Sequence, residues 1–282
     1  MEVPSSCCPS ESYSLVLFER EVFRRVVENQ GVELIVHGGV SGSRPIYAQT
    51  IRTTRIEEFE EIDFQRPFQD STRTLSPRLA RLLVNLSLTR NACCLLDPFC
   101  GLGTVLQEAL LSGVSIVGVD RDQLMVRRAK ENLAWLRHKY NITKELHDTV
   151  FAFDARRISK ARMPKVDAIA TEPILLPIFE SNPGVLDARK HIEKAREMYE
   201  KCMYEFATIL SRKNQRVAIV SPVLIDSFGS PRTFDISEVA RSAGLMPFTS
   251  STVLSNLIEY PVRLESMKKR TIQRNVYVFY LK

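Results

Sequence analysis

Four acidic residues stand directly after short apolar runs, and together they suggest one ligand site. They are Asp97, Asp120, Asp154 and Glu172. One acid in such a place is weak evidence, because turns between strands and helices often use Asp as a cap. In an open α/β sheet, however, ligands bind outside the carboxyl ends of the strands. Four acids at four strand ends therefore predict a polar site along one edge of a sheet.

The first acid opens a turn that suits close contact with a cofactor. The stretch reads Leu95-Leu96-Asp97-Pro98-Phe99-Cys100-Gly101-Leu102-Gly103-Thr104. Glycines at 101 and 103 allow the backbone to lie against a ligand. The Asp97 carboxylate can bind, through water, the ammonium group of a cofactor's amino-acid tail. A tight turn without a ligand is the alternative interpretation.

The next two acids fit a nucleoside. Asp120 follows Gly103 by 17 positions, close to the roughly 20 expected for an acid that binds ribose hydroxyls. This spacing also fits a nicotinamide dinucleotide enzyme, but Leu106 stands where GxGxxG has its third glycine. Asp154 can accept a hydrogen bond from an adenine amine, and a helix cap is the alternative role for it.

The reaction site is predicted at Glu172-Pro173. Methylation of an exocyclic amine requires the nitrogen lone pair to point at an electrophilic methyl group. A carboxylate and a backbone carbonyl can accept the two N–H groups and hold that lone pair in line. Pro173 would fix the loop and offer its carbonyl. The alternative is that Glu172 is merely a loop acid before a rigid turn.

Alternating strands and helices are needed to bring these residues together. Strands are expected to end at the four acids, and a further strand is expected over residues 216–221. The expected helices cover residues 78–88, 122–139, 186–212 and 236–243. Parallel neighbours need such crossovers, so the fold class is α/β with a mostly parallel sheet. Runs at 251–262 and 275–281 predict an antiparallel C-terminal edge hairpin.

The N-terminal part is predicted to be a small accessory region. Residues 1 to 74 form a small α+β extension in this interpretation, with a helix over 13–29 and strands over 33–37 and 47–55. About seventy residues are marginal for an independent domain. Residues 75 to 282 are predicted to form the main domain.

Composition narrows the class of partner and the compartment. The 282-residue chain has a formal net charge of +6 and a sequence pI of about 9.0, which suits RNA or DNA, although many basic proteins bind neither. The six cysteines show no CxxC spacing, so we expect no zinc site and a reducing, cytoplasmic location. No apolar run reaches the ~18 residues of a membrane span, and the N-terminus does not resemble a signal peptide.

From about Arg66 onward the chain resembles the archaeal and eukaryotic tRNA guanosine N2-methyltransferases, which are Rossmann-like class I enzymes. The segments that carry the resemblance are Arg66-Pro67-Phe68-Gln69-Asp70, Leu75-Ser76-Pro77-Arg78-Leu79-Ala80, Val84-Asn85-Leu86, Leu96 to Thr104, Gly118-Val119-Asp120 and Ala168 to Pro173. The family implies a seven-stranded sheet, S-adenosylmethionine as cofactor and tRNA as partner, without a metal.

The resemblance also implies roles for individual residues. The cofactor would contact the turn at Asp97, Phe99, Gly101 and Gly103, with Asp120 on its ribose and Asp154 near its adenine. Glu172 and Pro173 would hold the target amine.

Two features depart from the family. Its reaction site usually reads Asp-Pro-Pro-Tyr, whereas this chain has Glu172-Pro173-Ile174-Leu175. Leu175 cannot stack on a flipped base as Tyr would, and Phe179 is a candidate substitute. The N-terminal region is also shorter than the family's RNA-binding module. RNA capture is then expected from basic residues such as Lys268-Lys269-Arg270 with Arg274, or from a small protein partner.

Two other functions remain open from the sequence. A DNA adenine-N6 or cytosine-N4 methyltransferase uses the same carboxylate and proline. A methyltransferase-fold RNA-binding subunit with weak or no catalysis is the other, because the aromatic residue is missing at Leu175 and the N-terminal region is short.

Overall fold

The computed structural model describes residues 34–37, 46–49, 56–70, 75–142, 145–173, 177, 179, 181–248, 262–264 and 271–282. The chain divides into two compact units, Met1–Glu61 and Ile62–Lys282. Several expectations lie outside the described residues. They are the helix over 13–29, the strand over 251–261, the pair Ile174-Leu175 and the basic run Lys268-Lys269-Arg270.

In the first unit the described backbone forms a two-stranded sheet. Strand β1 (Leu34–His37) pairs with β2 (Ile46–Gln49) in antiparallel register, with Leu34 opposite Gln49. Helix α2 (Ile56–Gln65) follows and runs across the boundary between the two units.

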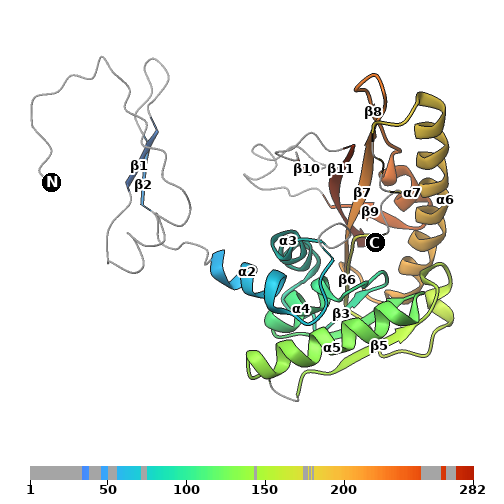
Figure 1. Ribbon diagram of the computed structural model, residues 1–282. Helices are drawn as coiled ribbons and strands as arrows, with labels where there is room; N and C mark the ends of the chain where they lie inside the picture. Colours follow the sequence, from blue (N-terminus) through green and yellow to red (C-terminus); the bar gives the residue numbers. More distant parts are fainter. Residues whose placement is uncertain are drawn as a thin grey trace, which may run out of the picture. The chain divides into compact units, whose positions relative to one another are not determined.

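The second unit is built on one sheet with the order β10-β11-β7-β6-β3-β4-β5 (Figure 1). The strands are β3 (Cys94–Asp97), β4 (Ser115–Asp120), β5 (Asp148–Ala152), β6 (Ala168–Thr171), β7 (Arg216–Ile225), β10 (Val262–Leu264) and β11 (Ile272–Leu281). Neighbours from β7 to β5 are parallel, whereas β11 is antiparallel to both β7 and β10. The predicted α/β class and the antiparallel C-terminal hairpin are confirmed.

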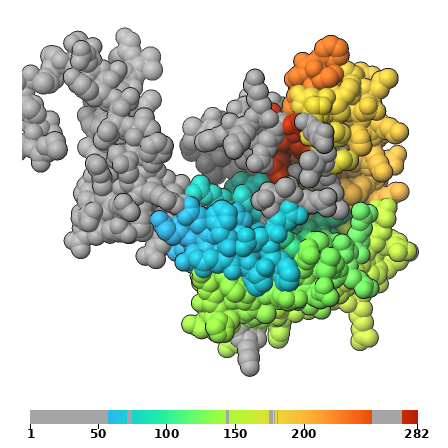
Figure 2. All heavy atoms as spheres, viewed as in Figure 1, coloured from blue at the N-terminus to red at the C-terminus, as the bar shows by residue number. Residues whose placement is uncertain are grey.

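Helices cover both faces of this sheet. Helices α3 (Pro77–Ser87), α4 (Thr104–Leu111) and α5 (Gln123–Lys139) pack on one face through Leu83, Leu106 and Leu133. The other face is covered by η2 (Ala155–Lys160), α6 (Val185–Ile209) and α7 (Ile236–Ser242). Figure 1 shows the long α6 standing beside β7, and Figure 2 shows one face of the molecule, with the green atoms of α5 along its lower part.

Local sequence signals explain where the helices begin. Ser76 Oγ accepts a hydrogen bond from Leu79 N at 3.3 Å, and Pro77 occupies the first helical position of α3. Asp122 caps α5 in the same way, with Leu124 N donating at 2.8 Å. These caps fix the helices that flank the glycine turn.

Strand β7 is longer than the sequence predicts. It continues past Ser221 to Ile225, although Pro222 cannot donate a hydrogen bond to a neighbouring strand. Its register with β6 ends at Thr171 opposite Ile219, so one edge of β7 has no β6 neighbour beyond that point. Two short strands were not predicted, namely β8 (Pro231–Arg232) on β7 and β9 (Leu245–Pro247) on β11.

Candidate functional site

The four predicted acids follow four neighbouring parallel strands. Asp97 and Asp120 are the last residues of β3 and β4, Glu172 follows β6 by one position, and Asp154 follows β5 by two. The strand order β6-β3-β4-β5 places their carboxyl ends side by side. The structure therefore brings all four acids to one edge of the sheet, as the sequence predicts.

Asp97 is the most buried of the four. Its side chain accepts hydrogen bonds at Oδ1 from Thr171 Oγ1 at 2.7 Å and from Phe99 N at 3.1 Å. The residue is only 2% exposed, and burial raises the pKa of its carboxyl to about 7, despite both hydrogen bonds. A cation bound beside this group would offset the cost of ionising it, which is what a cofactor's ammonium group can do.

The glycine turn connects β3 to α4. Gly101 and Gly103 have φ angles of +49° and +85°, which side-chain-bearing residues rarely adopt. Gly101 N donates to Asp120 Oδ2 at 3.0 Å, and Asp122 N donates to Asp120 Oδ1 at 2.9 Å. Each Asp120 oxygen keeps a lone pair for a ribose hydroxyl. A Cβ added at Gly101 would meet no atom of the described residues within 4 Å, so this part of the turn leaves room for a ligand.

Helix α4 approaches β4 unusually closely. A Cβ added at Gly118 would clash with Leu106 Cδ1, and Leu106 is fully buried. In a dinucleotide-binding turn, the third glycine allows close packing of helix on strand. Here the helix carries Leu106 at that position, and the strand carries the glycine. This arrangement supports the exclusion of a nicotinamide dinucleotide enzyme.

Asp154 has a local partner. It caps η2 through Arg156 N at 3.0 Å, and its carboxylate forms an ion pair with Arg156 at 2.6 Å. The hydrogen bond from the Arg156 side chain lowers the pKa of Asp154 to about 2. The cap predicted as an alternative is thus present, and a contact with adenine stays a prediction.

A buried hydrogen-bond network that was not predicted from the sequence lies behind the glycine turn. Asn132 on α5 accepts from Phe68 N at 2.9 Å and donates to Phe68 O at 3.1 Å and Leu102 O at 3.0 Å. Arg66, only 2% exposed, donates to Thr104 Oγ1 at 2.8 Å. The Arg66–Asp70 motif therefore lies against the turn. An Asn at a core position of the amphipathic α5 was the available signal.

The environment of Glu172 was also not foreseen. Arg274 on β11 donates from Nε to Glu172 Oε1 at 2.5 Å, and the two side chains are 26% and 10% exposed. Burial raises the pKa of Glu172 above its ordinary value, and the charge and hydrogen bond of Arg274 reduce this rise without cancelling it. Arg274 thus pairs with the predicted reaction-site carboxylate, and its part in a basic surface for RNA stays a prediction.

Phe179, the candidate for base stacking, contacts a helix residue. Its ring meets His191 of α6 edge to face, with centroids 5.3 Å apart. It also packs against the core on that face of the sheet and is only partly buried. Its proposed role stays a prediction.

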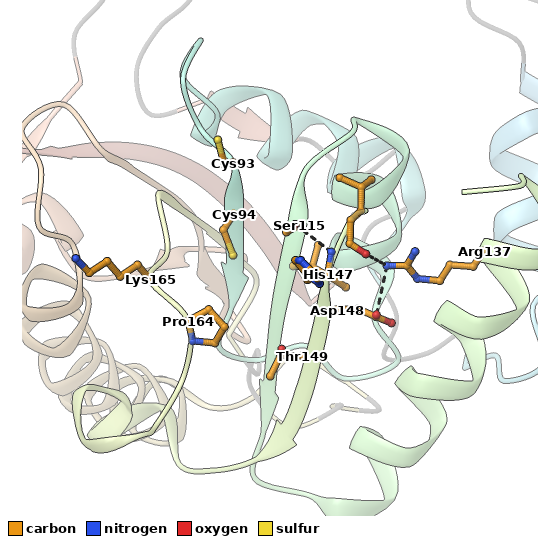
Figure 3. Close-up of a pocket in the computed structure, with 11 residues that line it drawn as sticks. Cys93, Cys94, Ser115, Arg137, His147, Asp148, Thr149, Pro164 and Lys165 are labelled. Carbon is orange, nitrogen blue, oxygen red and sulfur yellow. Dashed lines mark hydrogen bonds and ion pairs between the residues drawn. The ribbon is translucent and has the colours of Figure 1, made fainter. Parts of the chain in front are cut away.

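A surface depression of about 700 Å³ lies at the opposite end of the sheet (Figure 3). It is lined at the starts of β3, β4 and β5 by Cys94, Ser115 and Asp148. Arg137 is held there by Leu146 O and Asp148, as the dashed lines show. Because cofactors bind at the carboxyl ends of such strands, this depression is separate from the candidate site.

Metal and membrane signals are absent from the part of the chain that the structure describes. No group of three or more His, Cys, Asp or Glu side chains there is arranged to hold a metal ion. None of the helices described above combines the length and apolar character needed to cross a membrane.

Comparison with known proteins identifies the family. Residues 65–223 match the family described as RMKL-like, methyltransferase domain. The chain belongs to this methyltransferase family. The matched segment runs from just before Arg66 through the glycine turn and Glu172 into β7.

Individual relatives carry related names. The chain is 39% identical over 128 residues to a tRNA (guanine(10)-N2)-dimethyltransferase of Methanothermobacter thermautotrophicus, covering 45% of this chain and 33% of that protein. It is 33% identical over 193 residues to the protein of the same name from Pyrococcus abyssi, covering 68% of this chain and 52% of that one. The chain thus spans about half or less of these relatives' length.

A solved structure supports the fold. The crystal structure of TrmN from Thermus thermophilus aligns with a TM-score of 0.50 at 19% identity, covering 89% of this chain and 60% of that one. This likeness agrees with the sheet order and the helical layers.

Proposed function

We propose that the protein transfers a methyl group from S-adenosylmethionine to an exocyclic amine in RNA, with the N2 of a tRNA guanine as the target. Membership of the methyltransferase family and the names of the two relatives support this proposal. The observation that carries it is the position of Glu172-Pro173. This pair follows β6 directly, beside Asp97 and the glycine turn.

The residues at the strand ends fit the cofactor. The turn at Gly101 leaves open space, and Asp120 keeps acceptor capacity for ribose hydroxyls. Asp97 is a buried carboxyl for which the described residues supply no cationic partner, so it suits the ammonium group. Phe99, which donates its N–H to Asp97, and Gly103 complete the turn, and Asp154 would lie near adenine.

The cofactor supplies a methyl group on a sulfonium ion. When bound, it would let the amine nitrogen form an N–C bond with its lone pair as the C–S bond breaks, with the electron pair of that bond left on sulfur. The methylated nitrogen then loses a proton to the Glu172 carboxylate or to water. Glu172 and the Pro173 carbonyl accept the two N–H groups and so direct the lone pair at the methyl carbon.

The test uses the full chain with labelled S-adenosylmethionine and bulk tRNA, followed by nucleoside mass spectrometry. The wild type should produce N2-methylated guanosine. Glu172→Gln should lose at least about a hundredfold in rate with nearly unchanged cofactor affinity. The matched control is Glu205→Gln on α6, whose carboxylate accepts from Ser159 N, and it should keep its rate. Full turnover by Glu172→Gln would refute the assigned role.

The same assay separates the alternatives. Methylated adenine or cytosine in DNA, without product in tRNA, would favour the DNA enzyme. Failure to bind S-adenosylmethionine would favour the RNA-binding subunit, for which the Glu–Pro–Ile–Leu sequence after β6 is the supporting feature.

The setting of the reaction is part of the proposal. Residues 1 to 74 would be accessory to tRNA binding, and a small protein partner stays a prediction. The net charge of +6 favours an anionic substrate. The thiols of Cys93, Cys94, Cys100 and Cys202 form no disulfide, which agrees with a reducing cytoplasm.

A further inference from the structure

The ion pair between Glu172 and Arg274 spans a strand of the sheet. Glu172 follows β6, Arg274 lies on β11, and β7 separates these two strands. In the register, Thr171 is opposite Ile219 of β7, and Arg274 is opposite Pro222 of the same strand. The two side chains therefore meet across β7, just past the end of β6, although they are 102 positions apart.

Among the residues that the structure describes, one cation lies beside Glu172. Among the described residues, the ionisable groups coupled to its carboxylate are Asp97 of β3, Tyr199 of α6 and Arg274. Asp97 adds negative charge, and the Tyr199 hydroxyl donates to Val220 O at 2.6 Å. Arg274 is therefore the group that compensates the charge of a carboxylate whose side chain is 10% exposed.

The contact also limits how the carboxylate can be oriented. A glutamate has one more rotatable bond than an aspartate, so a mobile Glu172 would present its oxygens in several directions. Arg274 engages Oε1, and no other hydrogen bond to this carboxylate occurs in the described parts of the chain. Oε2 is thus left to accept an N–H from a substrate.

We propose that Arg274 is the positioning residue of the reaction site, which holds the Glu172 carboxylate charged and turned so that Oε2 meets the target amine. This inference rests on the proposed function of Glu172. Arg274 acts through Glu172 rather than on the substrate. Without the guanidinium, the buried carboxyl would take up a proton at neutral pH and lose its ability to accept the amine N–H.

The experiment compares Arg274→Gln and Arg274→Lys with a matched control. Arg232 forms a similar pair with fully buried Asp226 at 2.7 Å, at the turn between β7 and β8. Arg232→Gln therefore reports the cost of losing a buried arginine pair elsewhere. Single-turnover methyl transfer to tRNA is measured from pH 6 to pH 9.5 at saturating S-adenosylmethionine, and cofactor affinity is measured by calorimetry.

Arg274→Gln should lose about a hundredfold in rate at pH 7, because burial without the guanidinium raises the pKa of Glu172 further and leaves less of the carboxylate ionised. The rate should recover towards wild type as the pH rises to 9.5. Arg274→Lys keeps the charge, so it should retain the wild-type pH profile at a reduced rate. Arg232→Gln should show the wild-type profile, and all variants should bind the cofactor normally.

A titration keeps the inference separate from the proposed function. Protein labelled with carboxyl-¹³C glutamate is titrated by NMR, with the Glu172 signal assigned from Glu172→Gln. Arg274→Gln should shift that titration to higher pH, whether or not tRNA is the substrate. If the wild-type protein methylates no tRNA, that result would refute the proposed function but not the positioning role of Arg274. An unshifted titration would overturn the inference, and so would a shifted titration without a change in the pH profile of the rate.

Discussion

Thr171 Oγ1 donates a 2.7 Å hydrogen bond to Asp97 Oδ1, so the last residue of β6 holds the last residue of β3. Thr171 adjoins the reaction-site pair Glu172-Pro173, and Asp97 opens the cofactor turn. The bond thereby connects the two halves of the candidate site.

Replacing Thr171 should show how much the hydrogen bond to Asp97 stabilises the protein. Thr171→Val keeps the shape but removes the donor, which should cost about 1–3 kcal/mol of unfolding free energy. The cost should be larger at pH 8.5 than at pH 5.5, because the ionised Asp97 carboxylate gains more from the hydrogen bond. Urea denaturation at both pH values measures it. Thr233→Val, which removes a hydrogen bond to the Pro222 carbonyl, should show a pH-independent cost, and equal behaviour of the two variants would contradict this prediction.

The buried Asp97 should also give the protein a distinct pH dependence. Its pKa is raised to about 7 from 3.8, so its favourable contribution to stability is complete below about pH 4 and is lost as the pH rises through 7. The cofactor-free wild type should therefore lose unfolding free energy between pH 5 and pH 8 relative to Asp97→Asn. Asp154, with its lowered pKa of about 2, acts only below this window. Parallel pH profiles for the two proteins would disprove the assignment.

Cofactor binding should release protons near neutral pH. An ammonium group beside Asp97 lowers the pKa of that carboxyl, so the fraction protonated at pH 6.5 is lost on binding. Calorimetry in two buffers with different ionisation enthalpies should report a net release of up to about one proton. Asp97→Asn should bind more weakly and abolish this release. Identical binding enthalpies for the wild type in both buffers would exclude the proposed contact.

A side chain at position 118 should destabilise the protein while Leu106 is present. Gly118→Ala places a methyl group against Leu106 Cδ1, which should cost about 1–3 kcal/mol in urea denaturation. The double variant Gly118→Ala/Leu106→Ala should lose less unfolding free energy than the two single variants lose together, because the smaller side chain at position 106 removes the clash. Gly184→Ala, with no atom of the described residues within 4 Å of the added Cβ, should change stability little. Full additivity would contradict the contact.

Asn132 should control the shape of the cofactor turn. Asn132→Asp removes the N–H groups that reach Phe68 O and Leu102 O and places an acid in a buried position. We expect a loss of about 1–3 kcal/mol in unfolding free energy and a cofactor affinity reduced about tenfold. Glu131→Gln at the exposed neighbouring position of α5 is the control for both measurements. Unchanged affinity in Asn132→Asp would show that the turn holds its shape without the network.

Features that depend on neighbouring residues could be predicted from the sequence. Ser76 and Pro77 marked the start of α3, and Asp122 marked the start of α5, because capping acts within one helical turn. The strand-end acids followed from the alternation of apolar runs and helices. The Asp154–Arg156 pair was equally local, and the cap had been weighed as an alternative.

Contacts across the sheet could not be predicted in this way. The Glu172–Arg274 pair requires knowing that β11 inserts between β10 and β7, which no local pattern specifies. A strand was expected over residues 216–221, whereas pairing with β11 carries β7 on to Ile225. The Asn132 network depends on the approach of residues 66–70 to α5 from 64 positions away.

The continuity of α2 bears on how the protein can be divided. This helix spans Ile56–Gln65, whereas the boundary between the two units falls between Glu61 and Ile62. Ile62 is fully buried in the core of the second unit, and Arg66 follows the helix directly. A truncation at the boundary would cut the helix in half and leave Ile62 on a frayed end. A shortened protein meant to retain the cofactor turn should therefore begin at or before Ile56.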